Sequence, residues 1–159
     1  TRARYCAGDA AIGARFEQIR HEVLTQERDI SALKKEVLEM RQKMLDAHPN
    51  NSGQFDLKHD RGGIIDVEFT VQYLVLAHAH THPELTRNIG NLALLGMAAE
   101  LGLIAGEQAE SARDAYRHFR QWQHALRLQS ADYARIDQEQ AAPLVSGVKS
   151  LWHSVFGED

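Results

Sequence analysis

Two adjacent glycines, Gly62 and Gly63, lie in the middle of a cluster of charged residues, and a long apolar run follows them at once. Because glycine has no Cβ, the pair permits backbone conformations that other residues avoid, and it lets a ligand or another backbone segment approach closely. The run that follows, residues 64–77, is interrupted by only a few polar positions, so we expect it to be buried on most sides. The charged residues of the cluster are Asp56, Lys58, Asp60, Arg61, Asp66 and Glu68.

This charged cluster has two interpretations. If a helix begins just after Gly63, the free N–H groups of its first turn can bind an anion, and Lys58 and Arg61 would add positive charge there. Asp66 and Glu68 would instead suit a cation or the N–H groups themselves. In the structural alternative, Asp66 stabilises the helix start, and Lys58 or Arg61 is its salt-bridge partner. The spacing alone favours the structural interpretation.

Helical periodicity dominates the rest of the chain. Only three of the 159 residues are proline, and the alternation typical of strands is scarce. Apolar residues recur at spacings of three and four, as on one face of a helix. We therefore predict an all-α fold, a single helical bundle of about six helices, with one short extended segment at residues 55–58. Helices are predicted over residues 9–24, 30–46, 65–79, 88–101 and 106–130, and after Asp137.

Residues 64–80 carry an ambiguous pattern. Apolar and polar residues alternate from Ile65 to Tyr73, which is the period of a strand. The apolar run then continues to Ala77, which is too long for a typical strand. We predict a helix from about Ile65 to Ala79.

The composition excludes several classes of function. The net charge is −4, so no basic field attracts nucleic acid or an anionic membrane. No apolar stretch reaches membrane-spanning length, and we find no targeting signal. The single cysteine, Cys6, cannot form an internal disulfide and suits a reducing compartment. These features predict a cytoplasmic protein that binds neither nucleic acid nor membrane.

Three closely spaced histidines, His78, His80 and His82, raise the question of a metal site. On a helix, His78 and His82 share a face while His80 points elsewhere, and zinc needs about four converging ligands. Pro83 indicates that the helix ends nearby. We therefore expect a solvated helix end and no metal site.

The long helix predicted over residues 106–130 carries two further candidates. Tyr116, Phe119 and Trp122 lie close to His118 and His124, and such a group could stack on a base. Aromatic residues at helical spacing more often pack into a core. The same helix has a basic edge, which is more often a solvated face with salt bridges than a binding site. That edge consists of Arg113, Arg117, Arg120 and Arg127.

Residues 54–69 closely resemble the Asp-x-Lys…Gly-Gly-x-x-Asp-x-Glu-Phe signature of the glutamine synthetase adenylyltransferases. Looser relatives of the Gly-Gly-x-x-Asp element occur in the PII uridylyltransferases. The resemblance extends over about residues 1–130, and its motifs recur in the family's order. They are Thr1-Arg2-Ala3-Arg4 with Gly8-Asp9, Glu36-Val37, Met40-Arg41-Gln42-Lys43-Met44, residues 72–76, Thr86-Arg87-Asn88 and Tyr116-Arg117.

The resemblance implies that the chain is the C-terminal helical domain of the adenylylating half of a multidomain, bifunctional enzyme. The intact enzyme uses ATP and Mg²⁺ to move AMP onto a tyrosine of glutamine synthetase, and its other half removes AMP by phosphorolysis. Glutamine and the PII signal protein control it. The family's catalytic Gly-Ser-Asp motif and Asp-x-Asp pair are absent from the 159 residues. Because such a transfer needs carboxylates that hold Mg²⁺, we expect this chain alone to be inactive and to bind no cofactor or metal.

In this interpretation the signature segment completes the nucleotide or tyrosine site of the adjacent nucleotidyltransferase domain. Lys58 and Arg61 would offset phosphate charge, while Asp66 and Glu68 would orient those cations or a metal-bound water. The full set of candidate site residues is Lys58, Arg61, Gly62, Gly63, Asp66 and Glu68.

Two alternatives remain open at this point. The chain could be a non-catalytic interaction module that binds PII or glutamine synthetase, with the signature as structural support. It could also be an unrelated bundle that oligomerises through residues 30–46. We predict one helical domain over residues 1–159, made of a helical hairpin (1–50), the signature segment (54–69) and a bundle (64–159). The first helix could pack on an absent neighbour, which would expose an apolar patch here.

Overall fold

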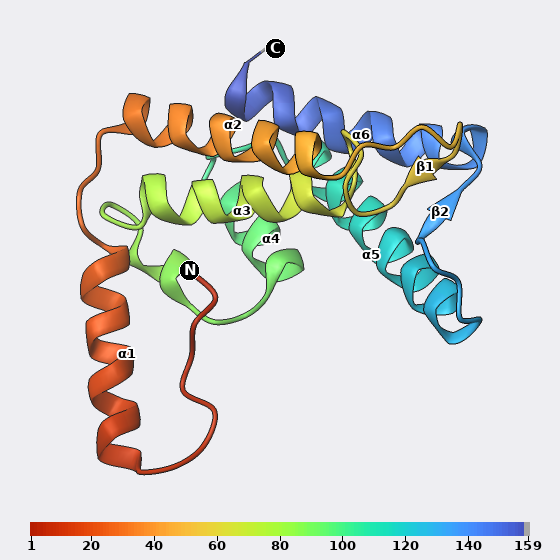
Figure 1. The fold of residues 1–159 in the computed structure, drawn as a ribbon. Helices are drawn as coiled ribbons and strands as arrows, with labels where there is room; N and C mark the ends of the chain where they lie inside the picture. The colour runs from red at the N-terminus through yellow and green to blue at the C-terminus, as the bar shows by residue number, and fades with distance from the viewer. Residues whose placement is uncertain (158–159) are drawn as a thin grey trace.

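Helix α3 (Ile64–His78) lies at the centre of the fold, and nine of its fifteen residues are buried. The structure, a computed structural model, describes residues 1–157. Because α3 is covered on most sides, its apolar residues do not follow a single stripe, and this explains the strand-like alternation in the sequence. The predicted helix is confirmed. Around α3 pack α2 (Ile30–Ala47), α4 (Asn91–Glu100), α5 (Gly106–Leu128) and α6 (Gln138–Phe156), as Figure 1 shows.

The all-α prediction is confirmed. Residues 1–157 contain six α-helices, the short 3₁₀ helix η1 (Pro83–Thr86) and a two-stranded ladder. In the ladder, β1 (Phe55–Asp56) pairs antiparallel with β2 (Arg135–Ile136). The predicted extended segment is shorter than expected and stops at Asp56. Its Oδ1 accepts hydrogen bonds from the N–H groups of Lys58 and His59, both at 2.9 Å, and so turns the chain.

Side-chain caps fix several helix ends. Asp9, Asp29 and Asp137 each accept hydrogen bonds from N–H groups of the helix that follows. Helix α4 ends at Glu100, just before Gly102, whose φ of +72° allows the N–H of Leu103 to reach the carbonyl of Ala98. The same helix begins at Asn91 and not at residue 88, because Gly90 has a non-helical φ of +82°.

The core lies between α3, α5 and α6. Its largest members include Phe119 from α5 and Leu151 and Trp152 from α6, all of which are buried. Phe55 brings the ladder into this core through a ring contact with Phe119 at 5.7 Å between centroids. Among residues 1–157, no helix is both long and apolar enough to cross a membrane.

Helix α1 (Ala10–Leu24) stands apart from the bundle (Figure 1). The predicted helical hairpin of residues 1–50 is wrong, because α1 packs on η1 while α2 packs along α3. The C-terminal end of α1 is anchored by Leu24, which is buried against Val75, Ala79 and Leu85. The rest of α1 has few contacts with the bundle.

The structure explains why a glycine, Gly13, lies inside α1. The ring of Tyr5 lies so close that a Cβ at position 13 would be 2.8 Å from three ring carbons. The Tyr5 hydroxyl donates a hydrogen bond to the carbonyl of Gly8 at 2.6 Å. The segment before α1 therefore folds back over the helix at this glycine.

Candidate functional site

The Gly62-Gly63 turn is closed off by the chain's own atoms. Gly62 has a φ of +88°, and a Cβ there would lie 2.7 Å from Cγ1 of Val145 in α6. A Cβ on Gly63 would lie 2.8 Å from the carbonyl oxygen of Leu57. The close approach that glycine permits is therefore made here by α6 and by the preceding turn.

The N–H groups at the start of α3 are not free. Those of Gly63, Ile64 and Ile65 donate to the carbonyls of Asp60, Leu57 and Lys58, at 3.0, 2.9 and 3.2 Å. The helix does begin where we predicted, but the anion site proposed for its first turn has no donors left. The preceding turn occupies the position that an anion would take.

Asp66 forms a buried ion pair with Arg41 of α2. The side chains are 2% and 1% exposed, and Nε of Arg41 donates to Oδ1 of Asp66. The other carboxylate oxygen accepts the N–H of Gly62 at 2.5 Å. Arg41 also donates to the carbonyl of His59 at 2.8 Å. Asp66 therefore forms a salt bridge, as in the structural interpretation. Its partner is Arg41, and neither Lys58 nor Arg61 pairs with it.

The turn before the glycines is held by carboxylates. Oδ2 of Asp60 accepts hydrogen bonds from the N–H of Asp56 at 2.8 Å and from the amide of Asn50 at 2.7 Å. His59 lies 3.3 Å from Asp56 and stacks on His48, with ring centroids 4.1 Å apart. Burial lowers the pKa of His59 below the ordinary 6.5, the nearby His48 lowers it further, and Asp56 acts in the opposite direction.

Lys58 and Arg61 lie at the edges of this turn and are half-buried. Arg61 donates to Oε1 of Gln42 in α2 at 3.2 Å. Lys58 lines a small pocket of about 150 Å³ beside Asp56 and Arg127. The structure thus keeps the two cations of the signature away from the Asp66 carboxylate.

Glu68 belongs to a second network on the opposite side of α3. Its Oε1 accepts hydrogen bonds from the Tyr116 hydroxyl at 3.0 Å and from Arg2 at 3.1 Å. The amide of Asn91 donates to the same hydroxyl at 3.0 Å. Burial raises the pKa of Tyr116, and the Glu68 carboxylate raises it further. Asp66 and Glu68 therefore do not act on a common ligand in this chain.

The carboxylates of the signature do not fit a Mg²⁺ site. Magnesium prefers carboxylate and phosphate oxygens in octahedral geometry. Asp66 is taken by Arg41 and Gly62, and Glu68 by Tyr116 and Arg2. Nowhere in the described part of the chain do three His, Cys, Asp or Glu side chains gather as metal ligands.

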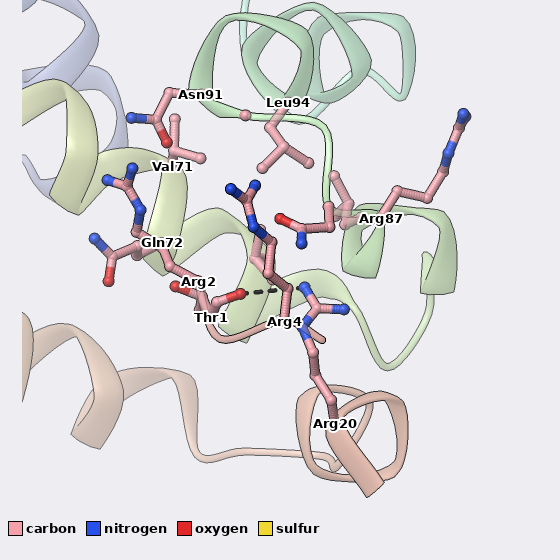
Figure 2. A pocket seen from close by; sticks show the side chains of 13 residues that line it. Thr1, Arg2, Arg4, Arg20, Val71, Gln72, Arg87, Asn91 and Leu94 are labelled. Atoms are coloured by element: carbon pink, nitrogen blue, oxygen red, sulfur yellow. Dashed lines mark hydrogen bonds between the residues drawn. The ribbon is translucent and has the colours of Figure 1, made fainter. Parts of the chain in front are cut away.

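An arginine-lined pocket lies next to the Glu68 network (Figure 2). It has a volume of about 250 Å³ and is bounded by the N-terminal segment, α1, α3, η1 and the start of α4. Four arginines contribute to its walls or rim: Arg2, Arg4, Arg20 and Arg87.

Known protein families and proteins resemble this chain in sequence. The family model described as GlnD PII-uridylyltransferase matches residues 31–140, which include both networks apart from Arg2. The chain belongs to this family. It is also 54% identical over 157 residues to the bifunctional glutamine synthetase adenylyltransferase/adenylyl-removing enzyme of Burkholderia mallei, and 55% identical over 157 residues to that of Aromatoleum aromaticum. These alignments cover 99% of this chain and 17% of each relative, so the chain spans about a sixth of the length of the curated relatives it matches.

The predicted resemblance to the glutamine synthetase adenylyltransferases is therefore confirmed. The structure adds the contacts that residues of the shared motifs make. Arg41 and Tyr116 lie within motifs that carried the resemblance, yet their partners, Asp66 and Glu68, are 25 and 48 positions away. Three arginines of the pocket, Arg2, Arg4 and Arg87, also lie in such motifs. The motifs mark these positions, but only the fold shows what each side chain contacts.

The remaining candidates have structural contacts in this family member. The Nδ1 of His80 lies 3.2 Å from the carbonyl of Thr25, and His82 lies 3.8 Å from Glu84. On α5, Phe119 is buried, and His118 packs beside Trp122 at 5.9 Å between ring centroids. Three arginines of the basic edge contact residues on their own helix, as expected for a solvated face. These contacts are Arg113 with Glu110, Arg117 with Asp114, and Arg120 with Gln123.

Proposed function

We propose that this chain is the helical accessory domain of a larger enzyme that transfers AMP from ATP to a tyrosine of glutamine synthetase. The observation that carries the proposal is the 54% identity over 99% of the chain to proteins whose name states that they adenylylate glutamine synthetase and remove the adenylyl group. In this proposal the other half of the enzyme removes AMP by phosphorolysis. The enzyme acts in the cytoplasm, where the free and exposed Cys6 stays reduced.

ATP and Mg²⁺ are held by the adjacent nucleotidyltransferase domain in this proposal. The 159 residues lack the Gly-Ser-Asp motif and the paired aspartates of a catalytic site. The signature carboxylates are already bound to Arg41, Gly62, Tyr116 and Arg2. This chain therefore contributes shape, support and charge next to the reaction and does not itself perform it.

The outer face of α1 is the surface that we propose docks on the neighbouring domain. Four apolar residues with helical spacing lie on this face and are exposed in residues 1–157. Exposed apolar stripes of this kind mark interaction sites. The relatives have several times the length of this chain, so they have further domains to cover the stripe. Its members and their exposures are Ile12 (71%), Phe16 (37%), Ile19 (44%) and Val23 (47%).

Lys58, Arg61 and Glu68 remain the proposed contributors to a composite active site. Each is only partly buried, so a neighbouring domain can reach it. Gly62, Gly63 and Asp66 were predicted for the same site, and we propose that they support it indirectly by holding the turn on which Lys58 and Arg61 lie. Their contacts with α2 and α6 favour this supporting role.

A second candidate function is a non-catalytic interaction module for PII or glutamine synthetase. The observation that favours it is the internal neutralisation of Asp66 by Arg41, which leaves this part of the signature without free charge. In that case the α1 stripe would bind the partner protein instead of the adjacent domain.

Serine substitutions in α1 test the proposal in the full-length enzyme. We expect Phe16→Ser with Ile19→Ser to lower AMP transfer to glutamine synthetase strongly, because the docked domains would separate. The stability of the 159-residue chain should change by no more than about 0.5 kcal/mol per substitution, since both side chains are exposed. Leu128→Ser is the matched control, because Leu128 is an exposed apolar residue at the far end of α5.

The outcomes separate the two candidate functions. Normal AMP transfer in the double variant would contradict docking through α1. Normal basal transfer with a lost response to PII would favour the interaction module. Lower transfer in Lys58→Gln and Arg61→Gln, with ATP binding by the neighbouring domain retained, would support the composite site.

A further inference from the structure

The arginine-lined pocket has no acidic residue among the thirteen residues that line it. Figure 2 shows the side chain of Arg4 pointing towards its middle, with Arg20 beside it. Arg2 lies on one flank, and Arg87 lies on the opposite rim with its side chain directed away from the middle. A concave surface with cations and without carboxylates concentrates positive potential.

The arginines of this pocket differ in how far they are already satisfied. Arg2 is paired with Glu68 at 3.1 Å. Arg20 is 11% exposed, forms an ion pair with Glu17 at 3.6 Å and donates to the carbonyls of Thr86 and Thr1, but its Nε is buried without a partner in residues 1–157. The guanidinium groups of Arg4 and Arg87 make no hydrogen bond or ion pair with the part of the chain that the structure describes. The pocket therefore holds donors that its own residues leave unused.

The start of α4 adds further donors on the same side. Gly90, Asn91 and Leu94 line the pocket, and no side chain caps this helix. Within the described residues, the N–H groups of Asn91, Leu92 and Ala93 have no acceptor, whereas that of Leu94 bonds to Gly90. An uncapped helix start carries partial positive charge and binds anions. The arginines and the start of α4 line the same pocket, so the charge of the guanidinium groups and the partial charge of the helix start act on one site.

We propose that this pocket binds the phosphoryl groups of a small phosphate compound, with Arg4 as the central ligand. Guanidinium groups match phosphate oxygens with paired, charge-assisted hydrogen bonds. Arg87 swings in from the rim, Arg20 supplies fixed positive charge, and the helix start binds a second phosphoryl group. The site does not depend on the proposed AMP transfer, because its donors all belong to this chain.

The size of the pocket limits what it takes. Its volume of about 250 Å³ is below the roughly 300–1,000 Å³ of pockets that enclose drug-sized ligands. A pair of linked phosphoryl groups fits inside, whereas a complete nucleotide would leave its base and ribose outside. The chemistry is shared by free pyrophosphate and by the phosphate chain of a nucleotide.

Titration of the 159-residue chain with pyrophosphate tests the proposal. We expect saturable binding at low ionic strength that weakens as salt is added. Arg4→Gln should weaken it by about tenfold, which corresponds to the loss of one charge-assisted hydrogen bond. Arg15→Gln removes the same charge from the exposed face of α1, outside the pocket, and should leave the affinity within about twofold. Far-UV circular dichroism of both variants verifies that they fold.

Parallel titrations with ATP, ADP and adenosine identify the source of the phosphoryl groups. Equal affinity for pyrophosphate and ADP, with none for adenosine, supports a site that contacts only phosphate. Tighter binding of ATP than of pyrophosphate, again weakened by Arg4→Gln, supports the nucleotide as the source. No binding of pyrophosphate by the unmodified chain, or equal weakening by Arg4→Gln and Arg15→Gln, would overturn the proposal. AMP transfer is not measured here, so failure of this site and failure of the proposed enzyme function remain distinguishable.

Discussion

Helices α3 and α1 are both fifteen residues long and both combine apolar with charged residues, but they use them in opposite ways. In α3, the side chains of Asp66 and Thr70 are buried and hydrogen-bonded, and the helix is covered by four others. In α1, only Gly13 and Leu24 are buried, and the apolar stripe is exposed. One helix organises the domain, and the other extends from it.

This contrast shows where functional groups remain available. Around the start of α3, the glycines and Asp66 are used by the fold itself, which leaves no room or donors for a ligand. Between α1 and α4, the arginines keep unused donors, and α1 keeps an uncovered face. In this structure the glycines and Asp66 of the signature segment therefore serve the fold, while unused donors lie in the arginine-lined pocket on another side of the molecule.

Removal of the buried carboxylate should have the largest effect. Asp66→Ala leaves the Arg41 guanidinium buried without its counter-ion, so we expect a loss of about 3–5 kcal/mol in the free energy of unfolding. Asp9→Ala removes a carboxylate that caps α1 and should cost only about 1 kcal/mol. Urea denaturation of the two variants compares the helices directly. Equal losses would show that α3 is no more dependent on its carboxylate than α1.

A methyl group at Gly62 should have the next largest effect. Gly62→Ala combines a positive φ with a Cβ that meets Val145, so we expect a destabilisation of about 2–4 kcal/mol. Gly53→Ala is the matched control, because Gly53 also has a positive φ, +73°, but its Cβ would have no atom within 4 Å. Its cost should be about 1–2 kcal/mol in the same denaturation assay. If the two variants lose the same stability, the contact between the turn and α6 is not tight.

A smaller effect should come from His59 as the pH is lowered. Its pKa is lower in the folded state than the ordinary 6.5, so the unfolded chain binds more protons just below that pH. The contribution of His59 to stability is therefore complete above pH 6.5 and is lost as the pH falls through the folded pKa. We expect urea denaturation at about pH 7.5 and about pH 5.5 to show a smaller difference for His59→Gln than for the unmodified chain. An unchanged difference would rule out His59 as a contributor. Burial also lowers the pKa of His78, so His78 changes the stability with pH in the same direction in the unmodified chain and in the His59→Gln variant.

Local chemistry made much of the fold predictable. Apolar spacing located the helices, and Asp137 marked the start of the last one. The length of the apolar run decided between helix and strand for α3. The errors fall where distant segments decide the outcome. The hairpin of residues 1–50 failed because the contacts of α1 with η1 and of α2 with α3 cannot be read from the local pattern.

The candidate site was harder to predict for the same reason. The sequence correctly indicated that Asp66 would be occupied structurally, but its partner is Arg41, 25 positions earlier in the chain. Asp66 and Glu68 are only two positions apart, so the sequence suggests one common site, but the helix directs them to different networks. The arginine-lined pocket gathers residues from the N-terminal segment, α1 and the segment before α4. No local pattern brings these positions together.

The contact of Gly62 with α6 has a mechanical consequence. Since Val145 and Lys149 lie directly against the glycine, α6 cannot slide past the start of α3 without a collision. The ladder between β1 and β2 ties the same two regions together a second time. A force applied to α6 would therefore displace α3 together with it as one rigid unit.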